Sequence, residues 1–176
     1  MKINPSFIVR DHLGTLHKAG STRLDTWDMV TFYGVPIACA IGAFAKGFAV
    51  TNDSYNVSIT FFGIFLALLL NIQVAIFSIF QRKWDVPTDK RLAEIQRKTM
   101  AARRELLGEL NANISYLTFV SCIGLAAVLI FYVEKWLTGV APAVAVFLYA
   151  HFLLTFVMIV KRSHALFQKE YRDSPE

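Results

Sequence analysis

Charge is scarce in this chain. Only 18% of its 176 residues are Asp, Glu, Lys or Arg, whereas a soluble domain usually carries about a quarter. The deficit is concentrated in four long stretches that contain none of these residues. The missing carboxylates exclude the aspartate pair of an intramembrane protease. They also argue against a transporter, which typically carries charge inside the membrane.

Cysteine and the common catalytic patterns are scarce as well. Cys39 and Cys122 lie in apolar stretches, where we expect small buried hydrophobic residues. The sequence has no HExxH, GxSxG, CxxC or GxxxxGK[ST] pattern. Its histidines are dispersed: His12, His17, His151 and His164. We therefore predict that the protein is not an enzyme and that it holds neither a metal nor another cofactor.

The stretches without charge are long and apolar. They cover residues 29–45, 57–80, 114–133 and 140–160. Each is long enough for a helix to cross about 30 Å of hydrocarbon, and the first extends to residue 50 if Lys46 reaches the interface. The runs are continuous rather than alternating, which excludes barrel strands. The sequence predicts an all-α membrane protein with four transmembrane helices.

The distribution of basic residues predicts the orientation. Sixteen of the eighteen Lys and Arg residues lie in 1–28, 81–113 and 161–176, and such residues stay on the cytoplasmic side. The protein is therefore expected in the inner (plasma) membrane, with both termini and the 81–113 connection on the cytoplasmic side. Residues 1–28 contain no apolar core of a cleavable signal peptide, so the first span is expected to direct insertion.

This orientation divides the chain into five parts. A cytoplasmic amphipathic segment (1–28) precedes the first transmembrane hairpin (29–80). A charged cytoplasmic helix (81–113) then leads to the second hairpin (114–160) and a cytoplasmic tail (161–176).

Polar residues inside the second span form a stripe. Thr60, Asn71 and Ser78 share one helical face. The stripe favours either a hydrogen bond to a neighbouring helix or the lining of a pore, and Gln73 offers a second tie between helices.

Two features of the other spans concern packing and ionisation. Gly34, Ala38 and Gly42 recur every four residues in the first span, which predicts close packing of helices. Pro36 is expected to bend that helix. His151 is an ionisable residue well inside the fourth span, so it is a candidate for gating. The alternative is a neutral histidine bonded to a neighbouring helix.

Residues 88–111 contrast with the rest of the chain by their density of charge. Thr88 is expected to cap a helix that continues into the third span, with Gly108 as a candidate hinge. One face is an apolar seam suited to self-association: Leu92, Ile95, Leu106 and Leu110. The opposite face is basic and suited to a protein partner: Lys90, Arg97 and Arg104. Glu94 and Lys98 have the spacing of a favourable ion pair. A solvated helix packed on the terminal segments is the alternative.

The layout suggests two functions. The first is a homo-oligomeric sensor or anchor in the lipid membrane, with a cytoplasmic protein partner docked on 81–113 and the termini. The second is a homo-oligomeric channel or pore-forming effector gated from the cytoplasm. The positive-inside rule accounts for the basic charge, so we do not expect direct binding of nucleic acid.

Four spans, cytoplasmic termini and a charged helix that runs into the third span resemble one known group. This layout is similar to the small membrane subunits of bacterial anti-phage defence systems, in particular the KwaA-like subunits of the Kiwa system. The resemblance covers topology and assigns no role to any residue. It implies a membrane-embedded homo-oligomer in antiviral defence, working with a soluble, nucleic-acid-binding partner encoded beside it.

Overall fold

The structure is a computed structural model that describes residues 4–16, 26–81, 88–134, 137 and 139–173. Parts of the predicted segments 1–28, 81–113 and 161–176 lie outside these residues. The described residues form helices and no strand: α1 (Ser6–Gly14), α2 (Thr26–Met29), η1 (Val30–Gly34), α3 (Val35–Ala45), α4 (Asn52–Phe80), α5 (Lys90–Glu134) and α6 (Ala141–Asp173). Because α2, η1 and α3 follow one another without a break, the described residues include four helices long and apolar enough to cross a membrane. The prediction of a multi-pass α-helical membrane protein is confirmed.

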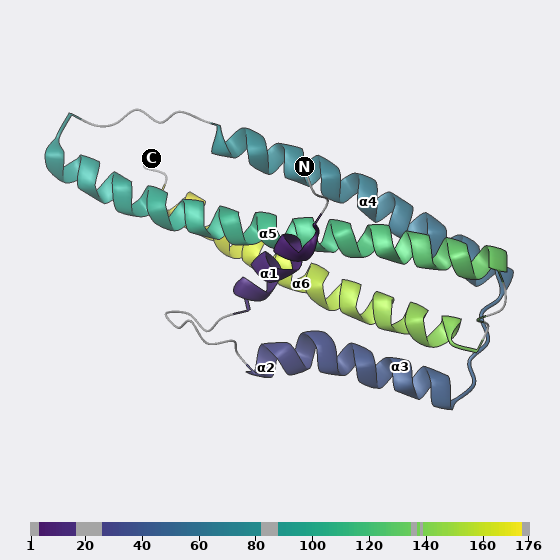
Figure 1. Cartoon of the computed structure of the whole chain (residues 1–176). Helices are drawn as coiled ribbons and strands as arrows, with labels where there is room; N and C mark the ends of the chain where they lie inside the picture. The colour runs from purple at the N-terminus through teal and green to yellow at the C-terminus, as the bar shows by residue number, and fades with distance from the viewer. Residues whose placement is uncertain (1–3, 17–25, 82–87, 135–136, 138, 174–176) are drawn as a thin grey trace.

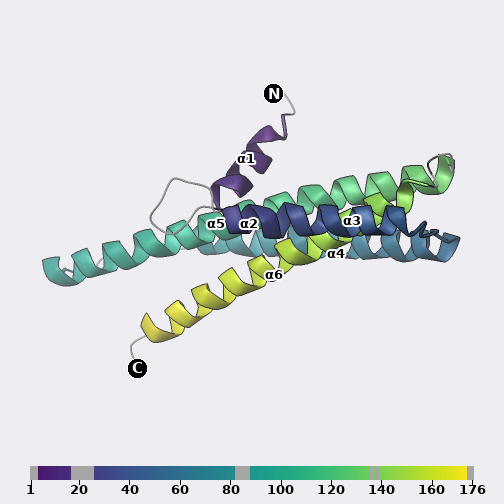
Figure 2. The same ribbon diagram turned by 90° about the horizontal axis from the view of Figure 1, so that it is seen from below.

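The four long helices lie side by side in an open row. α4 packs on α5, α5 packs on α6, and α6 packs on α3, in the order that Figure 1 shows. Among the described residues, α3 and α4 make no contact that would close the row into a ring. A larger share of α5 and α6 than of α3 and α4 is therefore buried. α1 is not part of the row: it projects to one side of it, as Figure 2 shows, and contacts α5.

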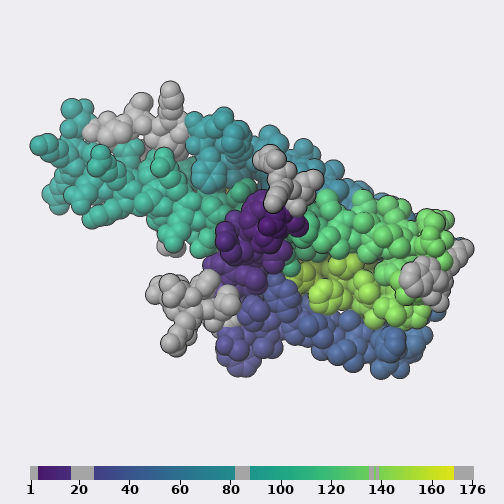
Figure 3. Space-filling model, in the orientation of Figure 1, coloured from purple at the N-terminus to yellow at the C-terminus, as the bar shows by residue number. Residues whose placement is uncertain are grey.

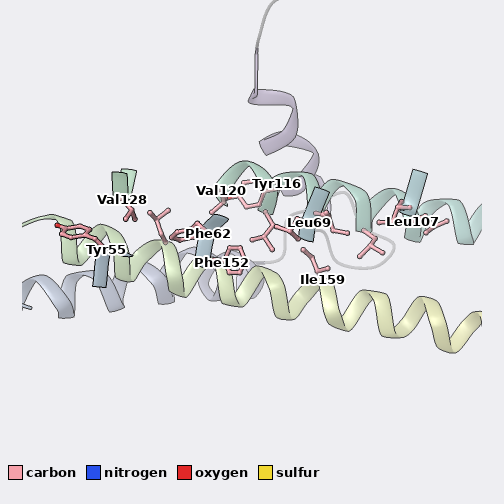
Figure 4. Close-up of a cluster of buried hydrophobic side chains, with 14 residues drawn as sticks. Tyr55, Phe62, Leu69, Leu107, Tyr116, Val120, Val128, Phe152 and Ile159 are labelled. Carbon is pink, nitrogen blue, oxygen red and sulfur yellow. The ribbon is translucent and has the colours of Figure 1, made fainter. Parts of the chain in front are cut away.

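An aromatic core holds the inner part of the row together (Figure 4). The Phe62 ring of α4 and the Phe152 ring of α6 are fully buried and meet edge to face, with centroids 6.0 Å apart. Phe62 also lies against Gly124 of α5, where an added Cβ would stand 3.0 Å from the ring. Gly124 is thus the glycine at which two long helices approach most closely.

Helix ends are set by local chemistry. α4 is capped by Thr51, whose hydroxyl accepts a hydrogen bond from the Ser54 amide at 3.2 Å. α3 ends at Ala45, short of residue 50, because Gly47 adopts a φ of 64° and reverses the chain. The expected cap of α5 is wrong by one residue. Asp89 rather than Thr88 accepts from the Arg91 amide, at 2.8 Å, and its carboxylate also suits the positive end of the helix.

The predicted disturbance at Pro36 takes the form of a π-helical turn. In an α-helix the Pro36 nitrogen would donate to the Phe32 carbonyl, but proline has no N–H. Directly before Pro36, η1 follows a wider path in which the Val35 amide donates to the Val30 carbonyl. The Phe32 carbonyl is left to accept a hydrogen bond from another helix.

The beginning of α5 extends beyond the other long helices, as both ribbon views show. We call residues 90–106 the α5 arm. The helix runs through Gly108 without interruption, and Leu107 and Leu110 already lie in the core. The arm is therefore about 25 Å of helix continuous with a segment buried inside the row.

Candidate functional site

A polar network lies where the α5 arm enters the row, and α1 contributes to it. Residues that face the row recur every four positions in this segment: Ile8 and His12 of α1, and Leu16 just after its end. His12 and Leu16 are fully buried, and in the space-filling view α1 lies directly over α5 (Figure 3). A nine-residue helix is thus held against the row with an imidazole at the centre of its contact face.

Asn113 of α5 receives the end of α1. Its side-chain oxygen lies 2.7 Å from His12 Nδ1 and 2.9 Å from the Thr15 hydroxyl. Its amide nitrogen donates to the Glu109 carbonyl at 2.7 Å, which fixes its orientation. Since the Asn113 oxygen can only accept, His12 Nδ1 carries a proton and donates it to Asn113.

Arg162 of α6 binds α1 and α5 together. One guanidinium nitrogen donates to Glu109 Oε2 at 3.0 Å, and the other donates to the Thr15 carbonyl at 2.6 Å. The Thr15 carbonyl lies at the C-terminal end of α1, where a helix presents its negative pole. α1 is therefore docked by a cation aimed at its end as well as by its buried face.

Tyr116 connects this docking site to the interior of the row. The His12 ring lies parallel to the Tyr116 ring, with centroids 3.8 Å apart and planes inclined by 2°. The Tyr116 hydroxyl lies 2.8 Å from His151 Nε2 and 3.4 Å from the Tyr33 hydroxyl. One side chain of α5 thus touches α1 with its ring and α6 with its hydroxyl.

His151 completes the network at the π-helical turn. Its Nδ1 lies 2.7 Å from the Phe32 carbonyl, the group that Pro36 leaves without a helical donor. A carbonyl only accepts, so His151 Nδ1 donates and Nε2 accepts the Tyr116 proton. The expected hydrogen bonds of His151 to neighbouring helices are present, while its neutral state and its role in gating stay predictions.

One nitrogen of the network has no partner. His12 Nε2 is buried without a hydrogen bond. The pKa of His12 is lowered to about 4, mainly by burial, with the nearby His151 and Arg162 acting in the same direction and the Asn113 hydrogen bond opposing them. Protonation would place a second, unsatisfied N–H in the same closed position. The site is consequently built for a neutral imidazole.

The contacts of the network hold helices in position relative to one another. Among the described residues, no three His, Cys, Asp or Glu side chains are grouped so as to hold a metal. Its parts come from four elements: α1, η1, α5 and α6. What the geometry can do is tie the position of α1 to that of the first span.

The predicted polar stripe of α4 lies elsewhere. Thr60, Asn71 and Ser78 are all exposed on this edge helix. Asn71 has no hydrogen bond and lines an open apolar depression between α4 and α6 together with Phe65 and Phe156. The tie between helices is made instead by Gln73, whose amide donates to the Ser115 hydroxyl at 2.7 Å.

The small-residue ladder of the first span is only partly covered by the rest of the chain, since Gly34 and Gly42 are half-buried and Ala38 is exposed. The residues of α3 buried against the row are Pro36 and Ala43. At about 100° per residue, Gly34, Ala38 and Gly42 lie on the opposite side of the helix. An added Cβ at Gly42 would meet nothing within 4 Å. Cys39 and Cys122 are likewise exposed rather than buried, because in a row the outer helix faces stay open.

The α5 arm presents the two predicted faces only in part. Lys90, Arg97 and Arg104 are exposed, and Glu94 and Lys98 form the expected ion pair at 3.1 Å. On the seam, Leu92 and Ile95 are more than half exposed, at 55% and 56%. Leu106 is half-buried and Leu110 is in the core of its own chain. The seam available to another chain is shorter than expected, since its C-terminal end is used inside the row.

Sequence reasoning missed the docking site itself. His12 carried one usable signal, since Ile8 and Leu16 flank it at four-residue spacing and place it on an apolar face. Asn113, Tyr116 and Arg162 carried none, because each stands alone at the edge of a span. Their meeting depends on which helices are neighbours.

No family model, curated protein or solved structure matches this chain.

Proposed function

We propose that the protein is an integral membrane subunit that self-associates and serves as an anchor or sensor for a cytoplasmic protein. One observation carries the proposal: the α5 arm leaves the row with Leu92 and Ile95 more than half exposed, on a helix whose continuation is buried among the others. Apolar side chains held in water at the end of a rigid helix are suited to a protein partner.

The charge distribution supports a cytoplasmic position for the arm. Lys90, Arg97 and Arg104 lie at the end of the row where the basic residues of the chain gather. The inner membrane and cytoplasmic termini follow from the same rule. A role in anti-phage defence rests on the resemblance in layout to the Kiwa membrane subunits.

Two experiments test the arm. In a chain with Cys39→Ser and Cys122→Ser, Ile95→Cys should form a disulfide-linked dimer in oxidised membranes. Arg97→Cys, on the opposite face, should not.

Reversing the charge of Lys90, Arg97 and Arg104 should abolish co-purification of the soluble protein encoded beside this one, whereas Arg10→Glu on the outer side of α1 should not. Equal cross-linking at both positions together with unchanged co-purification would refute the proposal.

A channel is the second candidate, favoured by the outward position of Thr60, Asn71 and Ser78 on α4. In an assembly of several copies this stripe would line a central pore. The purified protein in liposomes should then pass ions, and Asn71→Leu should reduce the flux. If the protein is an anchor without a pore, neither the native chain nor Asn71→Leu should pass ions.

A further inference from the structure

Two parts of the molecule that pack on different helices meet through Tyr116. α1 packs on α5, whereas the π-helical turn packs on α6. The Tyr116 ring stacks on His12 at 3.8 Å, and its hydroxyl binds His151, which in turn binds the Phe32 carbonyl of the turn. The contacts form one uninterrupted path from the N-terminal helix to the first span.

The π-helical turn depends on that path. Because Pro36 has no N–H, the Phe32 carbonyl cannot be satisfied within an α-helix at this position. His151 is the donor that replaces the missing one, at 2.7 Å. A carbonyl left without a donor inside a span is strongly disfavoured, so the turn must rearrange if His151 moves away.

α1 is built to be displaced. It has nine residues, too few for a stable helix alone in water. Its docking combines the buried side chains of His12 and Leu16 with polar contacts to Asn113 and Arg162 and the stacked ring of Tyr116. Another group that satisfies Arg162 and Asn113 can therefore replace it.

We propose that α1 is a displaceable latch, coupled through Tyr116 and His151 to the π-helical turn of the first span. This inference rests on the proposed function and names its regulation. The latch docks on Asn113 and on Arg162, which is paired with Glu109. Glu109 and Asn113 lie within two turns of Gly108, where the α5 arm enters the row. A protein that binds the arm and displaces α1 changes the first span, and a change in the first span releases α1, because coupling is reciprocal.

Hydrogen exchange of the full chain in nanodiscs tests the coupling without any partner. His12→Ala removes the stacked ring and the bond to Asn113. It should raise amide exchange at least fivefold in residues 8–16 and also in residues 30–35. Phe7→Ala, an exposed change on the same helix, should alter neither. Unchanged protection of α4 residues 57–80 shows that the fold persists.

Tyr116→Phe identifies the path, because it keeps the ring over His12 and deletes only the hydroxyl. In this background His12→Ala should no longer change exchange in residues 30–35. Pro36→Ala supplies the reciprocal test and spares the docking site. Its new N–H can satisfy Phe32 and free His151, so exchange in α1 should rise.

Several outcomes would overturn the latch. They are release of α1 by His12→Ala without any change in residues 30–35, an effect that survives Tyr116→Phe, and unaltered α1 exchange in Pro36→Ala. If His12→Ala unfolds the chain, Pro36→Ala alone decides. These results are independent of the arm, since absence of cross-linking at Ile95→Cys would refute self-association through the arm while leaving the coupling intact.

Discussion

Burial lowers the pKa of His12 to about 4, compared with 6.5 for an exposed imidazole. Undocked α1 therefore takes up a proton more readily than docked α1 does. The stability of docking is complete above pH 6.5 and declines as the pH falls toward 4. The loss amounts to about 3 kcal/mol over that window. Amide exchange in residues 8–16, corrected for the intrinsic effect of pH, should show α1 released as the pH is lowered from 7 to 5.

His12→Gln is the matched control for this prediction. Glutamine retains an N–H donor toward Asn113 and does not titrate. The other groups near the ring are Tyr116, His151, Glu109 and Arg162, and all of them remain in the variant. If the pH dependence of α1 exchange is as steep in His12→Gln as in the native chain, another group is responsible.

Gly124 is the position at which one methyl group should matter most. An added Cβ would stand 3.0 Å from two carbons of the buried Phe62 ring, which Tyr149 and Phe152 hold in place. Overpacking of this kind costs about 1–3 kcal/mol. That exceeds the gain of about 1 kcal/mol in helix propensity. Gly124→Ala should lower the free energy of unfolding in mixed micelles, whereas Gly42→Ala, with nothing within 4 Å, should not. Equal effects of Gly124→Ala and Gly42→Ala on the free energy of unfolding would show that α4 and α5 do not approach closely at Gly124.

The α5 arm should respond to a change at its base. Gly108 is exposed within a continuous helix, and an added Cβ would meet nothing within 4 Å. Alanine is favoured over glycine in a helix by about 1 kcal/mol. Gly108→Ala should therefore slow amide exchange in residues 100–107 about fivefold. Gly14→Ala, in the separate helix α1, should leave that exchange unchanged. Unchanged amide exchange in Gly108→Ala would mean that local opening of the helix at Gly108 does not determine the exchange rate of the arm.

At the scale of helices, the sequence was informative because hydrophobicity and charge report directly on the bilayer. All four spans and the continuity of α5 could be predicted from it. The ends were less predictable, since competing caps stand next to each other, as Thr88 and Asp89 do. The π-helical turn could not be predicted from the sequence. Pro36 predicts a disturbance, but its form depends on the histidine of another helix that supplies the missing donor.

The arrangement of the whole molecule could not be predicted in the same way. In a membrane, lipid-facing and protein-facing surfaces are both apolar, so the pattern does not reveal which helices are neighbours. The ladder of Gly34, Ala38 and Gly42 has the composition of an interface, yet α3 uses its opposite side against α6. In an open row, every such face of α3 and α4 stays available to lipid or to a second copy.

Two amides two residues apart in α4 distinguish packing within the row from packing between copies. Gln73 binds Ser115 of α5 at 2.7 Å, whereas Asn71 is exposed without a hydrogen bond. An amide facing hydrocarbon is expected to find a polar partner on another chain. Asn71→Leu should therefore shift the oligomer toward monomer in light scattering and leave the unfolding of each chain unchanged. Gln73→Leu should leave the oligomer unchanged and lower the stability of each chain by about 1 kcal/mol. If Asn71→Leu lowers chain stability and leaves the oligomer intact, α4 is not the helix through which copies meet.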